Sequence, residues 1–484
     1  MKEKNVKKNY IYNVAYQILV IITPLLTAPY VARVLGAGGI GVFSYVTAIS
    51  AFFIIFATLG TSTYGQREIS YVQNDAYGRS VAFWNTVAFR STTTAIFLII
   101  YGIFIAVVHP KWLIIYIIQF IEIINVACDT SWFFQGMEEF GKIVGRNAIF
   151  RIINLIMVFT LIKDSDDLAL YAAATALITM AGHVSLWAYL PKYLVKVPRT
   201  ALNPFKDTRT IIGLFLPTIA VQIYQYLDKI MIQAISSDEL ENGYYEQAMR
   251  ITRMVLVLVT SMSTVMIPRI GHYYKEGNKA AIKNAMYKAY NFAWFLGCPL
   301  MFGLFGIAKN FIPWFYGPGY EKDIILLQIA SGLSLAIAIN NVTGIQYLVP
   351  TKREKLYTKT VVVGAVINFC FNLVLIPHFL SYGAAAASVI AEACIAILQL
   401  IYVRDELDIR RILGFSFKYL VSGAMMLLLL LVEGQYWPTN FVSTFIMIIT
   451  GAAFYFGLLV LFKDQFFIEN ATSVISKIKG KIFR

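Results

Sequence analysis

The chain has 484 residues, of which 58% are hydrophobic and 14% are charged, and its mean hydropathy is +0.65. Soluble globular domains carry roughly 25% charged residues, so this composition excludes a soluble protein and indicates a membrane protein. Fourteen spans of about 22 residues would use roughly 308 residues and leave about a dozen for each connection or tail. That remainder excludes an added soluble catalytic domain.

Cysteine usage and the amino terminus exclude two further classes of protein. The four cysteines lie in apolar stretches, and none of their spacings is typical of a metal site or a redox motif. We therefore expect no disulfide framework and no resident cofactor. The basic first residues lead into an apolar run of more than about 20 residues, which is too long for the core of a signal peptide. This run is predicted to remain as the first span.

Apolar windows, bounded by charged residues or by glycine and proline, predict an all-α polytopic membrane protein. The third and fourth predicted spans are separated only by His109, Pro110 and Lys111. The fourteen predicted spans are 9–31, 40–64, 81–108, 112–135, 147–163, 168–190, 210–235, 243–268, 287–308, 324–349, 360–378, 383–403, 412–432 and 441–462.

The distribution of basic residues predicts the orientation in the membrane. Most of the 41 Lys and Arg residues flank one set of span ends, and the positive-inside rule places that set in the cytoplasm, together with both termini. The net charge of +14 then follows from topology and from contact with anionic lipids, and it does not indicate nucleic-acid binding. The basic residues predicted to lie outside are Arg33, Lys111, Lys163, Lys309 and Lys322.

A weak internal repeat has a period of about 200 residues. The first and seventh spans contain Pro24 and Pro217, and the next helix opens with a Gly-x-aromatic pattern at Gly41 and at Gly243. Halves of six helices both enter the membrane from the same side, as in transporters built from parallel repeats. The predicted parts are a six-helix lobe at 1–208, a second six-helix lobe at 209–411, and two further helices with a basic tail at 412–484.

Several blocks of sequence match a known family in order and spacing. Residues 35–45 read LGAGGIGVFSY and residues 59–69 read LGTSTYGQREI. These blocks resemble the opening of the Wzx-type oligosaccharide flippases, the polysaccharide biosynthesis branch of the MATE-like MOP exporter superfamily. The resemblance covers nearly the whole chain. Further matches are 227–229 (LDK), 243–248 (GYYEQA), 268–270 (PRI), Asn368, Asn372, 376–377 (IP) and 383–385 (GAA).

The resemblance implies a fold and a cargo. The implied fold has two six-helix lobes in a V around a central cavity, with two helices appended. The implied cargo is an oligosaccharide repeat unit on polyprenyl pyrophosphate, moved from the cytoplasmic to the outer leaflet of the bacterial plasma membrane. Capsule, exopolysaccharide or O-antigen assembly would use it, and a polysaccharide polymerase and chain-length machinery are candidate partners.

Ionisable residues within spans are candidate functional residues, because a charge in the bilayer is costly unless it is paired or meets water or a substrate. A structural interpretation stays open for each of them, either as an ion pair or through a long side chain that extends to the interface. The nine that qualify are Arg90, Glu122, Asp129, Asp228, Lys229, Glu246, Arg250, Arg253 and Glu392.

Arg250 and Arg253 are the strongest candidates for binding an anion. Their spacing of three places both guanidiniums on one face of the eighth span, roughly 5 to 10 Å from the midplane on the outer side. Guanidinium donors match phosphate geometry, so we predict that these two residues bind the pyrophosphate. Alternatively, Arg250 pairs with Glu246 one turn earlier, or with Asp228, and only stabilises the lobe.

Other polar residues are predicted to line the cavity. Arg90 and Lys229 would add positive charge, although both side chains could extend to the interface instead. Amides on single faces of the first and seventh spans could contact sugar hydroxyls, although packing between helices explains them nearly as well. These amides are Asn13, Gln17, Gln222 and Gln225.

A second group of residues is predicted to couple transport to an ion. Asn368 and Asn372 lie four residues apart on one helix face, and with Asp228 they offer oxygen ligands for a hard monovalent cation such as Na+. Relatives in the superfamily hold a cation in the corresponding lobe. Hydrogen bonding between helices is the alternative. Glu392 could carry H+ if burial raises its pKa.

Two other functions remain as alternatives. A cation-coupled multidrug exporter would share the fold, but its cavity should be acidic, whereas the strongest cluster in these spans carries two arginines. A polysaccharide polymerase or glycosyltransferase would need a catalytic loop on the outer face. The predicted outer loops are short and contain no assignable catalytic pair, so we expect no enzyme activity.

Overall fold

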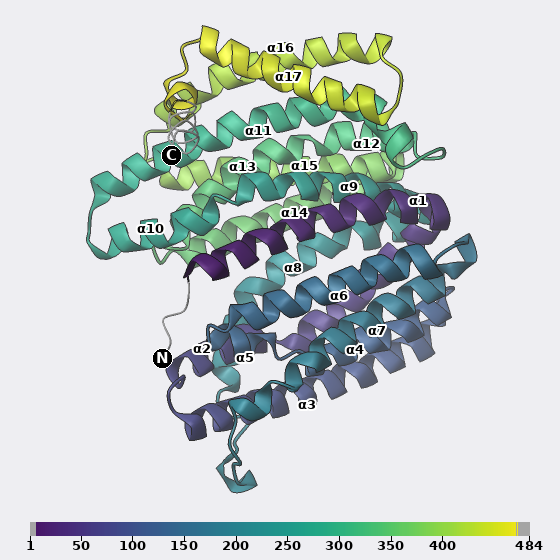
Figure 1. The fold of residues 1–484 in the computed structure, drawn as a ribbon, viewed down its shortest axis with the longest axis vertical. Helices are drawn as coiled ribbons and strands as arrows, with labels where there is room; N and C mark the ends of the chain where they lie inside the picture. Colours follow the sequence, from purple (N-terminus) through teal and green to yellow (C-terminus); the bar gives the residue numbers. More distant parts are fainter. Residues whose placement is uncertain (1–5, 471, 473–484) are drawn as a thin grey trace. The chain divides into compact units, whose positions relative to one another are not determined.

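The helical prediction is confirmed by a computed structural model of the chain (Figure 1). Every regular element in the described residues is a helix, and twelve helical segments there are long and apolar enough to cross a membrane. One of these segments, Ile22–Tyr71, contains the second predicted span and the end of the first. The structure describes residues 6–470 and 472, except for the side chains at 6–18, 20–21, 216–218 and 220–224.

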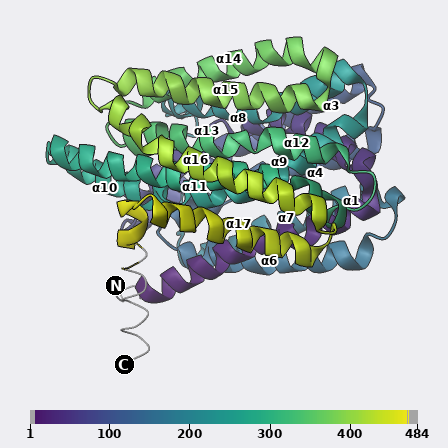
Figure 2. The same cartoon turned by 90° about the horizontal axis from the view of Figure 1, so that it is seen from above.

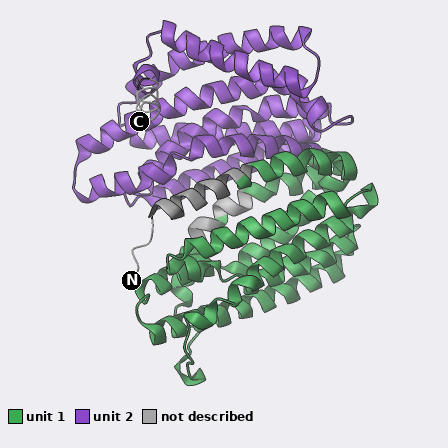
Figure 3. Ribbon diagram, in the orientation of Figure 1, with its two compact units in different colours: residues 1–243 green, residues 244–484 purple. Residues whose placement is uncertain are grey.

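The chain divides into two compact units, residues 1–243 and residues 244–484 (Figure 3). This division lies after the seventh predicted span, whereas the repeat places a lobe boundary at 208/209. The seventh span belongs to the first unit by its contacts, because it packs against the long amino-terminal helix. The observed division does not test the two lobes predicted from the repeat, and they remain a prediction.

The helices of the first unit follow the first seven predicted spans. Spans one and two form one long helix, which is interrupted at Gly36. The φ of Gly36 is 67°, a left-handed conformation that glycine adopts at little cost. The helices are α1 (Val6–Thr58), α2 (Thr61–Tyr71), α3 (Ala76–Val108), α4 (Leu113–Cys128), α5 (Ser131–Gly136), α6 (Phe140–Leu161), α7 (Leu168–Trp187) and α8 (Thr208–Ser236), with short 3₁₀ turns at Ser165–Asp167, Leu190–Lys192 and Arg199–Ala201.

The first unit is built around α1, which packs against α3, α4, α6 and α8, while α7 packs against α4 and α6. The short helices α2 and α5 contact each other. Aromatic side chains fill the space near that contact: Trp132 and Phe133 of α5 lie against Phe83 of α3, and all three are almost fully buried. The resulting core lies beside the carboxyl end of α4, where a buried ionic network is found.

The two glycines of the sequence repeat meet within the first unit. A Cβ added to Gly41 would lie 1.7 Å from the carbonyl oxygen of Glu239, and one added to Gly243 would lie 1.9 Å from that of Ala37. Helix α1 therefore contacts the first turns of α9 (Glu239–Thr260) backbone to backbone. Small residues permit such close approach between membrane helices, which is the physical reason for glycine at both positions.

The second unit continues through the remaining predicted spans. Its longest helix contains Pro299 and Pro313, and the span predicted at 324–349 forms two short α-helices followed by a π-helical turn. After α9, the helices are α10 (Ser263–Lys275), α11 (Lys279–Phe315), α12 (Lys322–Ala330), α13 (Gly332–Thr343), η4 (Gly344–Leu348), α14 (Glu354–Phe379), α15 (Ser381–Val403), α16 (Ile409–Tyr436) and α17 (Phe441–Leu461).

Packing in the second unit joins the last two helices to α11. Helices α16 and α17 both pack against α11, and α15 packs against α13 and α14 (Figure 2). A continuous hydrophobic core includes Tyr290 of α11, Tyr419 of α16 and Tyr455 of α17. The helices predicted as an appended pair are thus an integral part of the second unit.

Candidate functional site

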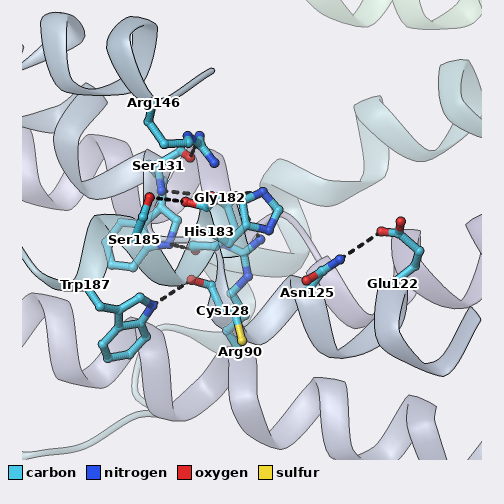
Figure 4. A network of polar contacts seen from close by, with 12 residues as sticks. Arg90, Glu122, Asn125, Cys128, Ser131, Arg146, Gly182, His183, Ser185 and Trp187 are labelled. Carbon is cyan, nitrogen blue, oxygen red and sulfur yellow. Dashed lines mark hydrogen bonds and ion pairs between the residues drawn. The ribbon is translucent and has the colours of Figure 1, made fainter. Parts of the chain in front are cut away.

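A buried ionic network lies in the first unit, at the junction of α3, α4 and α7 (Figure 4). The side chain of Arg90, on α3, is 4% exposed, and its Nη2 lies 3.6 Å from Oδ2 of Asp129. Its Nη1 donates a hydrogen bond of 3.3 Å to the backbone carbonyl of Asp129. His183 of α7 places its Nε2 4.0 Å from Oδ1 of the same carboxylate. Arg90 therefore lies inside the unit as the partner of an acid.

The ends of the neighbouring helices hold Asp129 in place. Asp129 follows the last residue of α4, and its Oδ1 accepts a hydrogen bond of 2.9 Å from the backbone N–H of Ser131. Arg146 of α6 donates to Ser131 Oγ at 2.9 Å. Trp187 Nε1 donates to the carbonyl of Cys128 at 2.7 Å (Figure 4). The ion pair, and not a side chain extended to the membrane interface, accounts for the position of Arg90.

The arginines of α9 form a second ionic network, which belongs to the second unit. Arg253 Nη2 lies 2.7 Å from Oε1 of Glu246, and Arg250 Nη2 lies 3.7 Å from the same oxygen. The side chain of Arg253 is 52% exposed and that of Arg250 is 23% exposed. The predicted pairing of Arg250 with Glu246 is present. One carboxylate thus faces two guanidiniums, and the Arg253 side chain keeps half of its surface exposed.

The amides predicted to hold a cation are brought together inside the second unit. Asn372 Nδ2 donates to Asn368 Oδ1 at 3.0 Å, and Asn368 Nδ2 donates to Ser388 Oγ at 3.4 Å. Both asparagines are fully buried. The bond to Ser388 joins α14 to α15, as the alternative of hydrogen bonding between helices predicts. Asp228 lies in the first unit with 5% of its surface exposed, so the cation site built from all three residues stays a prediction.

The remaining predicted site residues occupy different environments. Glu392 of α15 accepts a short hydrogen bond from Asn340 of α13. Lys229 is 9% exposed. Gln225 is exposed. Asn13, Gln17 and Gln222 lie outside the residues whose side chains the structure describes.

The first unit also contains a cavity that sequence analysis did not predict. Its volume is about 510 Å³, and its wall includes Gln119 and Glu122 of α4 and Thr47 of α1. Glu122 Oε2 accepts a hydrogen bond of 3.0 Å from Asn125 Nδ2 (Figure 4). Gln119 lies three residues before Glu122, and this spacing on one helix face is the sequence signal that could have identified the pair.

Two families match large parts of the sequence. The family described as "Polysaccharide biosynthesis protein" matches residues 6–274, which is more than half of the chain. The family described as "Lipid II flippase MurJ" matches residues 148–451. The first match includes the blocks at 35–45 and 59–69, and together the two families span nearly the whole transmembrane region. They agree with the fold described above.

Individual proteins agree with the family matches. The "Putative O-antigen transporter" of Escherichia coli (strain K12) is 22% identical over 413 residues, which are 83% of this chain and 97% of that relative. The solved structure titled "Lipid II flippase MurJ, inward closed conformation" aligns with a TM-score of 0.70 and 15% identity, over 94% of this chain and 98% of that one. An inward-facing multidrug resistance MATE family transporter of the MOP superfamily aligns with a TM-score of 0.66 and 13% identity, over 84% of this chain and 98% of that one. The chain therefore belongs to the polysaccharide biosynthesis protein family, the Wzx-type flippases of the MOP superfamily, and it is a transporter and not an enzyme.

Proposed function

We propose that this protein moves polyprenyl-pyrophosphate-linked oligosaccharide repeat units from the cytoplasmic to the outer leaflet of the bacterial plasma membrane. One observation carries the proposal: the family match over residues 6–274, supported by similarity along 97% of a relative named for O-antigen transport. Capsular polysaccharide, exopolysaccharide or O-antigen would be the product assembled from these units. A polysaccharide polymerase and chain-length machinery are the proposed partners, and membrane lipids surround the protein.

Alternating access is the proposed mechanism, with both termini in the cytoplasm. Two compact units of nearly equal length suit a transporter in which one half moves against the other. The polyprenyl tail would stay in lipid while the glycan and the pyrophosphate cross the membrane through the protein. Each state would then expose the headgroup site to one side of the membrane only.

Arg250 and Arg253 are the proposed ligands of the pyrophosphate. A diphosphate offers several acceptor oxygens to the forked donors of guanidinium groups. Arg253 is half-exposed and shares one carboxylate with Arg250, so its guanidinium stays accessible to an anion. Arg90 is a weaker candidate for this role because its guanidinium is enclosed and already faces Asp129.

A gradient of Na+ or H+ is the proposed energy source. Asp228, Asn368 and Asn372 would hold a cation, and Glu392 would carry a proton. Replacing Na+ with choline in vesicles that contain the purified protein distinguishes the two ions, because only an Na+-coupled protein would lose transport. If transport persists without either gradient, the coupling proposal is wrong while the flippase proposal stands.

The peptidoglycan precursor lipid II is a second candidate substrate. It is supported by the match of residues 148–451 to the lipid II flippase family. The multidrug alternative has only similarity of fold in its support. Because lipid II also carries a polyprenyl pyrophosphate, the same arginines would serve either substrate.

The proposal is tested by measuring, leaflet by leaflet, the polyprenyl-pyrophosphate oligosaccharide in cells depleted of this protein. We expect complete repeat units to accumulate on the cytoplasmic leaflet and to reach the outer leaflet again when the wild-type gene is restored. Accumulation of lipid II in place of the oligosaccharide would establish the second candidate. Normal transfer of both lipids after depletion would exclude a flippase function.

A further inference from the structure

His183 lies near the carboxyl end of α7, four residues before the helix ends at Trp187 (Figure 4). Its Nε2 is 4.0 Å from Oδ1 of Asp129, which is longer than a hydrogen bond of about 2.7–3.2 Å. The side chain is 21% exposed, and the predicted topology places this end of α7 near the cytoplasm. The imidazole and the carboxylate are therefore neighbours separated by a gap that a small movement would close.

The carboxylate of Asp129 has capacity for another hydrogen bond. Its Oδ1 accepts a bond of 2.9 Å from the backbone N–H of Ser131, and its Oδ2 lies 3.6 Å from Nη2 of Arg90. An ionised carboxylate offers about four acceptor positions. A charged imidazole donates through both ring nitrogens, and its bond to a carboxylate is stronger than that of a neutral ring. Proton binding at His183 would thus turn the 4.0 Å approach into a charge-assisted hydrogen bond.

In the described part of the chain, the charged groups that face the imidazole come from three different elements. Asp129, after the end of α4, attracts a positive charge on the ring, whereas Arg90 of α3 and Arg146 of α6 repel it. Glu122, two turns earlier on α4, is hydrogen-bonded to Asn125. Because attraction and repulsion come from different elements, a small shift of α7 changes the affinity of His183 for a proton.

This arrangement links proton binding to the position of a helix. A ligand that binds one conformation more tightly stabilises that conformation, and the dependence is reciprocal. A charged His183 bonded to Asp129 would draw α7 toward the end of α4, and loss of the proton would release it. Because α7 packs against both α4 and α6, the movement would reach both helices.

We propose that His183 binds a proton during the transport cycle, and that the charged imidazole joins α7 to the end of α4 through Asp129. The effect on transport rests on the flippase function proposed above. The site is separate from Glu392, which lies in the second unit. A metal ion suits the site less well, because the described residues contain no group of three or more His, Cys, Asp or Glu side chains that could hold one.

A second histidine provides a matched control. His272 of α10 places its Nε2 3.2 Å from Oε1 of Glu276, and the two side chains are 66% and 50% exposed. The two residues are four apart in the sequence, so a proton on His272 joins no separate helices. His272→Gln should therefore leave both the titration of His183 and the transport rate unchanged.

The test is 15N NMR of the full-length protein in nanodiscs, labelled at histidine. The chain contains four histidines, so the signal that His183→Gln removes is that of His183. We expect this signal to titrate between about pH 5 and pH 8. Asp129→Asn should lower the midpoint by about one pH unit or more, because an attracting charge is lost, and Arg146→Gln should raise it, because a repelling charge is lost.

Two results of the NMR experiment would overturn the proposal. One is a His183 signal that does not change over this pH range. The other is a midpoint that responds to neither substitution. Arg146→Gln keeps the test decisive if Asp129→Asn does not fold, because it leaves the pair of Arg90 and Asp129 in place.

Transport measurements on the same variants separate this inference from the proposed function. Oligosaccharide transfer by the wild type in vesicles should change about fivefold or more across the same pH range, and His183→Gln should remove this dependence. If the wild type transfers the oligosaccharide but His183→Gln keeps the same pH dependence, or if the wild-type rate is equal at every pH, the proton proposal is wrong and the flippase function stands. If the wild type transfers no oligosaccharide at any pH, the flippase function itself fails.

Discussion

The two ionic networks use the same kinds of residue in opposite environments. In the first unit, one guanidinium faces one carboxylate and one imidazole, and the Arg90 side chain is 4% exposed. In the second unit, two guanidiniums share the carboxylate of Glu246, and Arg253 is 52% exposed. The first network satisfies its charges internally, whereas the second keeps an accessible cation.

The difference between the two networks shows that an arginine within a span can have either of two roles, stabilising the protein or binding a ligand. A buried, matched ion pair is strongly destabilised when one partner is removed, because the other charge is left in a medium of low polarity. Replacing a half-exposed arginine lowers the stability of the protein only a little. Such an arginine can also exchange its protein partner for an anionic ligand. Exposure and charge balance, and not residue type, therefore distinguish a structural arginine from a binding arginine.

The largest expected effect follows from Arg90→Met. Its loss leaves Asp129 without its nearest cation, and we expect the free energy of unfolding to fall by about 3 kcal/mol. Thermal unfolding of the purified protein in detergent measures the change. A double variant, Arg90→Met with Asp129→Leu, should recover part of the stability because no uncompensated acid remains.

The opposite result for Arg90→Met would contradict the structural role assigned to Arg90. A fully stable Arg90→Met protein that no longer transfers oligosaccharide would make Arg90 a substrate ligand, as the sequence predicts. The distinction requires stability and transfer to be measured on the same preparation.

An intermediate effect, on transport alone, is expected for Arg253→Gln. A charge-assisted hydrogen bond contributes about 1.5–3 kcal/mol, so the rate of oligosaccharide transfer should fall roughly tenfold or more. The unfolding temperature should stay close to that of the wild type, because the side chain is half-exposed. Leaflet-resolved quantification of the lipid-linked oligosaccharide measures the rate.

Two further variants sharpen the test of Arg253. Arg269→Gln removes an exposed arginine whose Nε donates to Tyr273, and it should leave transport unchanged. Glu246→Gln removes the shared carboxylate and frees both guanidiniums, so a pyrophosphate site should keep its function. If Glu246→Gln and Arg253→Gln impair transport equally, the ion pair itself is what matters, and the binding role is refuted.

The smallest effect is expected from an ion pair between the residue before α14 and the turn after α15. Arg353 Nη1 lies 2.6 Å from Oε1 of Glu406, with the side chains 27% and 44% exposed. Tyr347 also donates a short hydrogen bond to Glu406. Exposed pairs contribute little because water and salt screen them, so Glu406→Gln should cost less than about 1 kcal/mol in thermal unfolding. A loss in the free energy of unfolding comparable to that of Arg90→Met would show that the exposure of an ion pair does not predict its contribution to stability.

Much of the architecture could be predicted from the sequence. Apolar windows located the helices because a bilayer requires long apolar segments with internally satisfied backbone. The glycines of the repeat, Gly41 and Gly243, were recognised as a pattern, but their backbone contact was not. Likewise, the break in α1 at Gly36 depends on a single backbone conformation, which hydropathy does not report.

Pairing of the polar residues was decided by tertiary structure. Sequence spacing correctly joined Arg250 to Glu246, because residues four apart on a helix are neighbours. It could not join Arg90 of α3 to Asp129 after the end of α4, nor show that Gln119 lines a cavity with Thr47. Local periodicity and hydropathy thus determined the class of protein, its helices and its family resemblance. Packing between distant helices alone decided which charges are enclosed and which stay accessible, because burial and partnership depend on contacts that span the sequence.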